Sequence, residues 1–171
     1  MALYLNNGSI SRAPERTPRT SCGTAANFTY SNVPSWADRI TLNIENLSNN
    51  AGYNYQLRIG DSDGIETSGY YGCGWYDNGG FGGSRDTTGW RMPMGSAGHS
   101  INGSIVLTRA DNGSGTKWAV FAVFGDNGSN LECGIGGWKS LNTDLTSIRF
   151  GMDGGSIDSG TYSFVFEELG A

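Results

Sequence analysis

The segment Arg39–Glu45 reads RITLNIE, and its pattern indicates which class of fold to expect. Ile40, Leu42 and Ile44 alternate with polar residues, and this period of two places the three apolar side chains on one face of an extended chain. The polar residues between them then face the opposite way. The segment therefore predicts a β-strand with one buried face and one solvated face.

The same alternation recurs further along the chain. In the next such segment four apolar side chains are predicted to point inward: Tyr53, Tyr55, Leu57 and Ile59. Gln56 and Arg58 lie between them and are predicted to point outward. Further alternating segments cover residues 101–107, 131–135, 148–152 and 162–166, and each of them is predicted to form a strand.

Residues 118–124 read WAVFAVF and are apolar at every position, which predicts a central strand covered on both faces. The clearest hairpin joins Lys117–Gly125 to Asn130–Gly136. Asn-Gly pairs, which favour the backbone conformations of tight turns, occur five times. The sequence therefore predicts an all-β fold, a single-domain β-sandwich of about eight strands and of the jelly-roll type.

Length and charge narrow the class of protein. The 171 residues suit one domain, divided into an extended N-terminal arm over residues 1–26 and a β-sandwich over residues 27–171. A net charge of −5 argues against a nucleic-acid partner, because phosphate binding needs clustered Lys and Arg. The sequence shows neither an apolar run long enough to cross a bilayer nor a secretory signal. We expect synthesis in a cytoplasm and no membrane partner.

The N-terminal arm differs from the rest of the chain in composition. Pro14 and Pro18 interrupt ladder pairing, and apolar periodicity ends after Ile10. The segment is therefore predicted to be extended, either lying along a neighbouring subunit or hanging free. Its basic side chains are the predicted contacts to a partner: Arg12, Arg16 and Arg19.

Residues 69–98 form the longest predicted connection, and they combine glycine with aromatic side chains. Connections of this length are uncommon in compact domains and are usually functional or disordered. Three roles stay open for this segment: a ligand-binding surface, a subunit interface, and a cover for a sheet edge. The candidate rings are Tyr70, Tyr71, Trp75, Tyr76, Phe81 and Trp90.

The sequence predicts no catalytic residue, no metal site and no cofactor. His99 stands beside Ser100, but such a pair is more typical of a strand edge than of a nucleophile and its base. The segment Asp61–Gly64 resembles the start of a calcium loop, yet the bidentate Glu of an EF-hand would fall at Gly72. We therefore interpret these acidic residues as turn-forming.

Three cysteines cannot all pair within one chain. Cys22, Cys73 and Cys133 also lack the Cys-x-x-Cys spacing that would indicate zinc. We interpret them as free thiols, typical of a reducing compartment, with a Cys73–Cys133 bridge as the alternative.

Three short motifs carry a family resemblance. Val33–Thr41 reads VPSWADRIT, Ile59–Tyr70 reads IGDSDGIETSGY and Gly160–Phe164 reads GTYSF. In this order and spacing they resemble a β module of tail-fibre and other virion proteins of tailed bacteriophages. The resemblance covers about residues 27–168. It implies a jelly-roll-like sandwich that assembles as a homotrimer on the particle exterior, without a cofactor or catalytic residues.

The chain departs from that module because it has no fibre shaft and because the aromatic segment 69–98 is unusually large. A free-standing β domain with an arm suits a capsid decoration (cement) protein that trimerises and binds the major capsid protein through the arm. The alternative is a receptor-binding adhesin on the tail that recognises host cell-surface glycan through the aromatic segment. A small carbohydrate-active enzyme is the third and weakest hypothesis.

Overall fold

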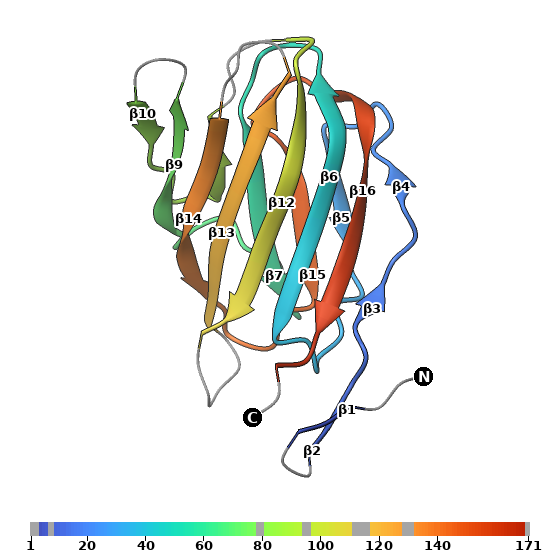
Figure 1. The fold of residues 1–171 in the computed structure, drawn as a ribbon. Helices are drawn as coiled ribbons and strands as arrows, with labels where there is room; N and C mark the ends of the chain where they lie inside the picture. The colour runs from blue at the N-terminus through green and yellow to red at the C-terminus, as the bar shows by residue number, and fades with distance from the viewer. Residues whose placement is uncertain are drawn as a thin grey trace.

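Two antiparallel β-sheets pack against each other in this chain (Figure 1). The structure, a computed structural model, describes residues 4–6, 9–77, 81–93, 97–110, 117–127 and 132–169. The all-β class expected from the alternating segments is confirmed. Within the described ranges there is no helix long and apolar enough to span a membrane.

The strands divide unequally between the two sheets. The larger sheet contains β3 (Glu15–Arg16), β4 (Thr20–Ser21), β6 (Arg39–Asn49), β9 (Tyr71–Asp77), β10 (Phe81–Ser84), β12 (Ser100–Arg109), β13 (Lys117–Asp126), β14 (Glu132–Ser140) and β16 (Ile157–Glu167). Its order is β10-β9-β14-β13-β12-β6-β16-β3, and β4 also pairs with β16. The smaller sheet contains β5 (Asn27–Tyr30), β7 (Tyr55–Asp61), β8 (Gly64–Ile65), β11 (Trp90–Met92) and β15 (Ser147–Met152). Its order is β11-β7-β15-β5, and β8 also pairs with β7.

A separate two-stranded hairpin, β1 (Tyr4–Asn6) and β2 (Ser9–Ser11), precedes both sheets. Sixteen strands are thus present in the described residues, against about eight expected. Six of them are only two or three residues long, and a strand of that length carries no period that a sequence pattern could reveal.

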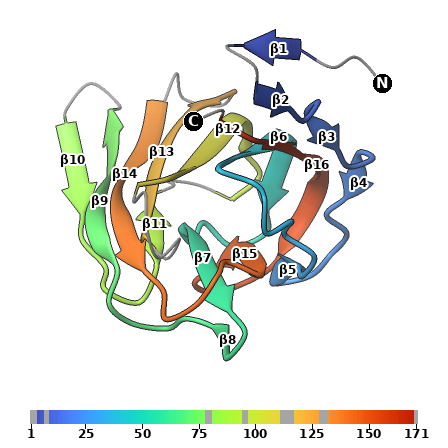
Figure 2. The ribbon, with the colours of Figure 1, turned by 90° about the horizontal axis from the view of Figure 1, so that it is seen from below.

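The core lies between the two sheets. Figure 2 shows the larger sheet curling like part of a barrel around the smaller one, which faces its concave side. Ile40, Leu42 and Ile44 of β6 point into this space and are buried, as their alternation predicted. The largest fully buried side chains are Trp118, Tyr55, Tyr70, Phe124, Phe150, Phe164 and Phe166.

A long ladder joins β6 to β16, from Arg39↔Glu167 to Asn49↔Ile157. Register shifts interrupt it on either side of Ser159, next to Gly160, whose φ of +114° favours glycine. A Cβ at Gly160 would also approach the Leu47 backbone to 2.6 Å. The C-terminal motif GTYSF therefore owes its glycine to a bulge that keeps the two strands paired.

The prediction that residues 118–124 form a strand covered on both faces was wrong. Trp118, Val120, Ala122 and Phe124 are buried, but Phe121 is 61% and Val123 is 41% exposed. The smaller sheet covers only the concave side of β13, so the outward apolar residues contact solvent in this chain. The predicted hairpin itself is confirmed, because β13 pairs with β14 over nine positions; its turn lies largely outside the described residues.

Two further orientations differ from the prediction. Tyr53 lies before β7 and is 48% exposed. Gln56 was expected to point into solvent, yet it is buried. Its Nε2 donates to Asp86 Oδ2 and to Thr88 Oγ1, both at 3.1 Å. The segment 86–88, distant in sequence, covers this position on the outer side of the sheet.

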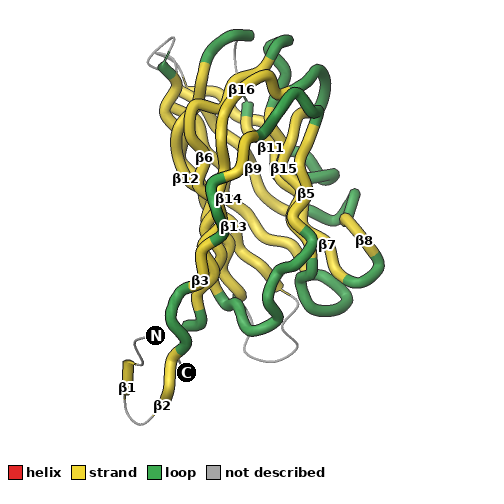
Figure 3. Tube along the Cα trace, turned by 90° about the vertical axis from the view of Figure 1, so that its right-hand side faces the viewer, coloured by secondary structure: helices red, strands yellow, loops and turns green. Residues whose placement is uncertain are grey.

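The N-terminal arm does not hang free between Arg12 and Ala26. Its short strands β3 and β4 pair with β16, and Thr17 both donates its N–H to Phe164 O and accepts from Phe164 N through Oγ1. Cys22 is buried in the core. Pro14 and Pro18 limit each ladder to two residues, but they do not prevent pairing with the chain's own edge strand. Only the β1–β2 hairpin extends beyond the sandwich (Figure 3).

The prediction that residues 69–98 form a long connection without strands was also wrong. Residues 71–77 and 81–84 form the antiparallel pair β9–β10, and β9 continues the larger sheet beyond β14. Residues 90–92 form β11 at the edge of the smaller sheet. The strand period could not be recognised here because seven of residues 69–83 are glycines, which carry no side chain.

We predict that substituting two phenylalanines of β13 has effects of very different size on the free energy of unfolding. Phe124→Ala should lower the free energy of unfolding by about 3–5 kcal/mol, because the ring is fully buried. Phe121→Ala should change the free energy of unfolding of the single chain, measured at a dilution at which it is monomeric, by no more than about 0.5 kcal/mol, because that ring is exposed. Urea unfolding of both variants measures the difference, and equal losses would contradict the one-sided burial of this strand.

Candidate functional site

An exposed aromatic face covers the convex side of β9, β14 and β13. Six large apolar side chains are exposed among the described residues, and four of them gather on these three neighbouring strands. We call the following residues the aromatic face: Tyr71 (57% exposed), Phe121 (61%), Val123 (41%) and Trp138 (38%). Monomeric soluble proteins seldom expose contiguous apolar patches, so this concentration marks a candidate binding surface.

Strand register brings these rings together. Trp138 of β14 is paired with Tyr71 of β9 on one side and with Ala119 of β13 on the other. The Tyr71 and Trp138 rings stack with their centroids 4.3 Å apart and their planes 9° from parallel. Lys117 Nζ lies 4.4 Å from the centroid of the Trp138 ring. Ring stacking and the cation–π contact fix the position of Trp138 even though it lies on the surface.

Glycines keep the centre of this surface flat. A Cβ at Gly134 would lie 2.7 Å from the Trp75 ring, so the indole rests against the backbone of β14. A Cβ at Gly136 would meet nothing within 4 Å, and that glycine lies between Phe121 and Cys73 in the register. Because the middle strand carries few side chains here, a partner could approach its backbone closely.

A surface pocket of about 380 Å³ adjoins the aromatic face. It is lined by Tyr70, Tyr71, Gly72, Cys73, Arg85, Asp86 and Thr87. Asp86 Oδ1 accepts hydrogen bonds from the backbone N–H and the hydroxyl of Thr88, both at 2.7 Å. Burial opposes ionisation of this carboxyl, but the Thr88 hydrogen bonds and the positive charges of Arg91 and Arg58 together outweigh it and lower the Asp86 pKa. The pocket thus combines an aromatic ring with a guanidinium and a carboxylate.

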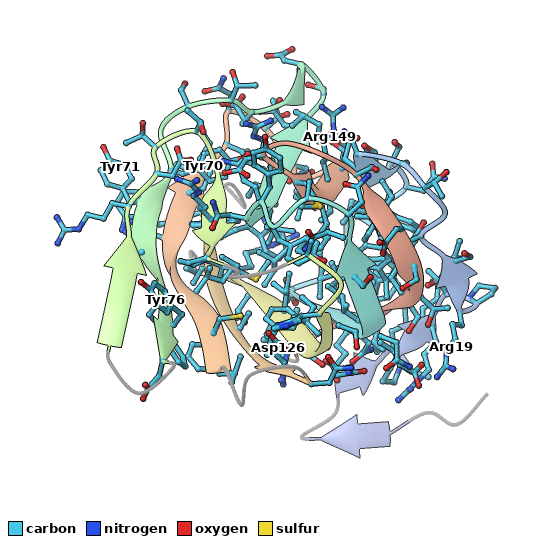
Figure 4. All side chains as sticks on the ribbon, turned by 90° about the horizontal axis from the view of Figure 1, so that it is seen from above. Arg19, Tyr70, Tyr71, Tyr76, Asp126 and Arg149 are labelled. Carbon is cyan, nitrogen blue, oxygen red and sulfur yellow. The ribbon has the colours of Figure 1, made fainter. Side chains whose placement is uncertain are left out.

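The six candidate rings have different surroundings. Tyr70 and Trp90 are buried and meet edge to face at 5.0 Å, so neither presents a ring face to a ligand. Figure 4 shows Tyr71 at the periphery, while Tyr70 lies further in. Trp75 and Tyr76 are half-buried, and Tyr76 packs against the core. The side chain of Phe81 lies outside the described residues.

Tyr70 stabilises the fold by joining its own segment to Ile59 and Glu66. Its hydroxyl accepts from Ile59 N at 2.8 Å and lies within hydrogen-bond distance of Ile59 O and Glu66 O, at 3.0 and 3.1 Å. Burial raises the Tyr70 pKa far above its ordinary value, so the hydroxyl keeps its proton. Gly69, with φ of +72°, makes the turn that delivers the ring. Hydrogen bonds of Tyr70 therefore join the last residue of the motif IGDSDGIETSGY to its first residue, Ile59.

The predicted arm contacts are directed largely at the chain itself. Arg12 donates its N–H to Glu168 Oε2 at 3.0 Å, and its guanidinium lies 4.5 Å from the Trp36 ring centroid. Arg19 forms an ion pair with Glu45 at 2.8 Å. Arg16 is exposed on β3. Two of the three arginines thus fasten the arm to its own sandwich.

The polar residues considered for chemistry serve the fold. His99 Nδ1 lies 2.9 Å from Asp126 Oδ2 and links β12 to β13 at a strand edge. Asp61 accepts backbone N–H bonds from Asp63, Asn142 and Thr143. Burial acts to raise the Asp61 pKa, but these bonds together lower it. No group of three or more potential metal-binding side chains occurs within the described ranges.

All three cysteines are free thiols. Cys133 points into the core, whereas Cys73 points outward and is paired with Gly136. A Cys73–Cys133 bridge would have to cross the sheet, because the two side chains lie on opposite faces. Burial raises the Cys133 pKa to about 12 and the Cys22 pKa to about 11, which suppresses their thiolates.

Sequence reasoning missed Phe121, Val123 and Trp138 as surface residues. The unbroken apolar run 118–124 was the available signal, and it was interpreted as double burial. No protein-family model, curated protein or solved structure matches this chain.

We predict selective modification of Cys73. In the monomeric chain a thiol reagent at pH 8 should label one equivalent before unfolding and three after it, because Cys22 and Cys133 are buried and Cys73 is exposed. Mass spectrometry of peptides should place the native label on Cys73. Rapid native labelling of Cys133 would contradict the inward orientation given to it.

Proposed function

We propose that the chain is a virion structural protein of a tailed bacteriophage, a capsid decoration protein that assembles as a homotrimer on the particle exterior. The aromatic face is the observation that carries this proposal. Four exposed large apolar side chains on three adjacent strands would be unfavourable on an isolated monomer, and burial between copies removes them from water. The three-motif resemblance supplies the expected partner class and the trimeric state.

The composition of this face favours a protein partner. Aromatic rings are enriched at the centres of interfaces, where they bury a large area at little entropic cost. The Tyr71–Trp138 stack and the lysine above it hold Trp138 in place before any partner binds. Such preorganisation reduces the entropy lost on association.

The arm contributes to the proposed function through its first part only. Residues 12–26 cover the β16 edge of the same chain, whereas the β1–β2 hairpin extends beyond the sandwich. We therefore assign capsid contact to residues 1–11. Covering the β16 edge also suits a subunit that must not pair indiscriminately through its open strand.

The finer fold assignment, a jelly roll, belongs to the same proposal. Three nested strand pairs support it: β6 with β16, β7 with β15, and β9 with β14. Successive pairs alternate between the larger and the smaller sheet. This is how a long folded ribbon wraps in jelly-roll proteins.

We predict that Phe121→Asp abolishes self-association. The wild type should sediment at three times the mass of the chain, whereas the variant should sediment as a monomer, because a charge at the centre of an apolar interface cannot be desolvated without a partner. Its circular dichroism spectrum should be unchanged, since Phe121 is exposed.

Leu169→Asp is the matched control, because Leu169 is also an exposed apolar residue but lies beyond β16. It should remain trimeric. A chain lacking residues 1–11 should also remain trimeric and should lose binding to capsids. A monomeric wild type, or a trimer that survives Phe121→Asp, would overturn the assignment of the interface.

A second function, that of a receptor-binding adhesin, is favoured by the pocket beside Tyr71. Exposed rings stack on sugar faces, and Arg85 and Asp86 offer polar partners to hydroxyl groups. For this second function the aromatic face stays uncovered, and display of several copies through another face would multiply a weak affinity at each site.

We predict for this function that Tyr71→Ala abolishes adsorption to purified host-surface polysaccharide at an unchanged melting temperature. Tyr53→Ala removes a comparably exposed ring away from the pocket and should adsorb normally. Surface plasmon resonance on immobilised polysaccharide measures both variants. Equal adsorption of Tyr71→Ala and the wild type would exclude this pocket as the glycan site.

A further inference from the structure

Two arginines face each other on the outer side of the smaller sheet. Arg58 of β7 and Arg149 of β15 are register partners in an antiparallel ladder, and both are partly exposed. Like charges placed directly opposite across two strands repel each other and weaken the pairing. Figure 4 shows Arg149 at the periphery of the molecule, on the side of the smaller sheet.

The two guanidinium groups are oriented by bonds to only one nitrogen each. Arg58 Nε donates to Thr88 O at 2.8 Å, and Arg149 Nε donates to Thr29 Oγ1 at 3.1 Å. Among the described residues, no hydrogen bond or ion pair is made to the terminal nitrogens of either side chain. Both planar guanidinium groups are therefore held in place, and their terminal N–H groups are available to a ligand.

A hollow of about 50 Å³ lies between these forks. It is lined by Asn27, Gln56, Arg58, Arg149, Gly151 and Met152. A Cβ at Gly151 would approach Ala26 O to 2.6 Å, so a glycine is required there and no side chain fills the space. The hollow is bordered by two guanidiniums and two carboxamides, and it has the size of a small oxyanion.

The nearby carboxylates are committed elsewhere. Asp86 accepts from Thr88 through Oδ1 and from Gln56 through Oδ2. Asp153 pairs with Arg91 at 2.7 Å and accepts from Asn54 N at 3.0 Å. Neither Arg58 nor Arg149 has a carboxylate within ion-pair distance among the described residues. Asp86 interacts with Arg58 through its charge without forming an ion pair, so one carboxylate partly offsets two arginines and a net positive charge remains at this point of a chain whose net charge is −5.

We propose that Arg58 and Arg149 bind an oxyanion, either a carboxylate or a sulfate group, in the hollow above Gly151. Each guanidinium fork can donate two N–H groups to such a ligand, and the anion would offset the repulsion across the ladder. This site lies on the smaller sheet, and the aromatic face lies on the convex side of the larger one, so the proposal is independent of the proposed function.

The test is titration of the full chain with sodium sulfate and, separately, sodium acetate, each against sodium chloride at matched ionic strength. Binding to the folded state should raise the melting temperature beyond the chloride control. The anion that produces the larger shift identifies the ligand class. Backbone amide resonances of Gly151 and the side-chain Nε resonances of both arginines should move with the same dissociation constant.

Arg149→Gln should weaken binding of the effective anion about tenfold or more, because one charged fork is lost. It should also raise the melting temperature in chloride alone, because the like-charge pair is gone. Arg149→Lys keeps the charge without the fork and should bind with intermediate affinity.

Arg16→Gln removes an exposed arginine from the larger sheet and is the matched control, with wild-type affinity expected. The proposal is overturned if neither anion exceeds chloride in the wild type. It is also overturned if Arg16→Gln and Arg149→Gln lose affinity equally, since binding would then reflect net charge alone.

Discussion

The ladder between β6 and β16 positions most of the other elements in this fold. It joins residues 39–49 to residues 157–167, and so brings the beginning and the end of the sandwich side by side within the larger sheet. On one side of this pair β6 receives β12, which leads on to β13, β14 and β9. On the other side β16 receives the arm. Both candidate interaction regions, the aromatic face and the arm, are therefore placed by a single pairing.

The two sides of the curved larger sheet have different roles: one forms the core, and the other carries the proposed binding surface. Its concave side holds the core against the smaller sheet, whereas its convex side exposes Phe121 and Trp138. Apolar residues on the covered side stabilise the chain, and those on the uncovered side are available for association. The resembling motifs belong to the first group: Tyr70 locks a turn onto β7, and Gly160 permits the bulge in β16. The motifs specify the scaffold, and the surface features outside them carry the functional proposals.

The smaller sheet has a different outer surface. Arg58 and Arg149 stand opposite each other there, and segment 86–88 covers Gln56, whose Nε2 donates to Asp86. A net charge of −5 gave no indication of such a local concentration of positive charge, because Arg58 and Arg149 are far apart in the sequence and meet only through strand register. Long-range pairing of this kind decides local electrostatics, which composition averages away.

The all-β class, the inward residues of β6 and the β13–β14 hairpin could be predicted from the residues alone, because side-chain alternation and turn chemistry are local properties. Which faces are covered depends instead on contacts between distant segments. These contacts bury Tyr70 and Trp90, leave Phe121 exposed, and place residues 12–26 along β16. A period of two says that one face differs from the other; it does not say whether a second sheet lies above an apolar face. That depends on sheet size and curvature, which arise from contacts between distant segments.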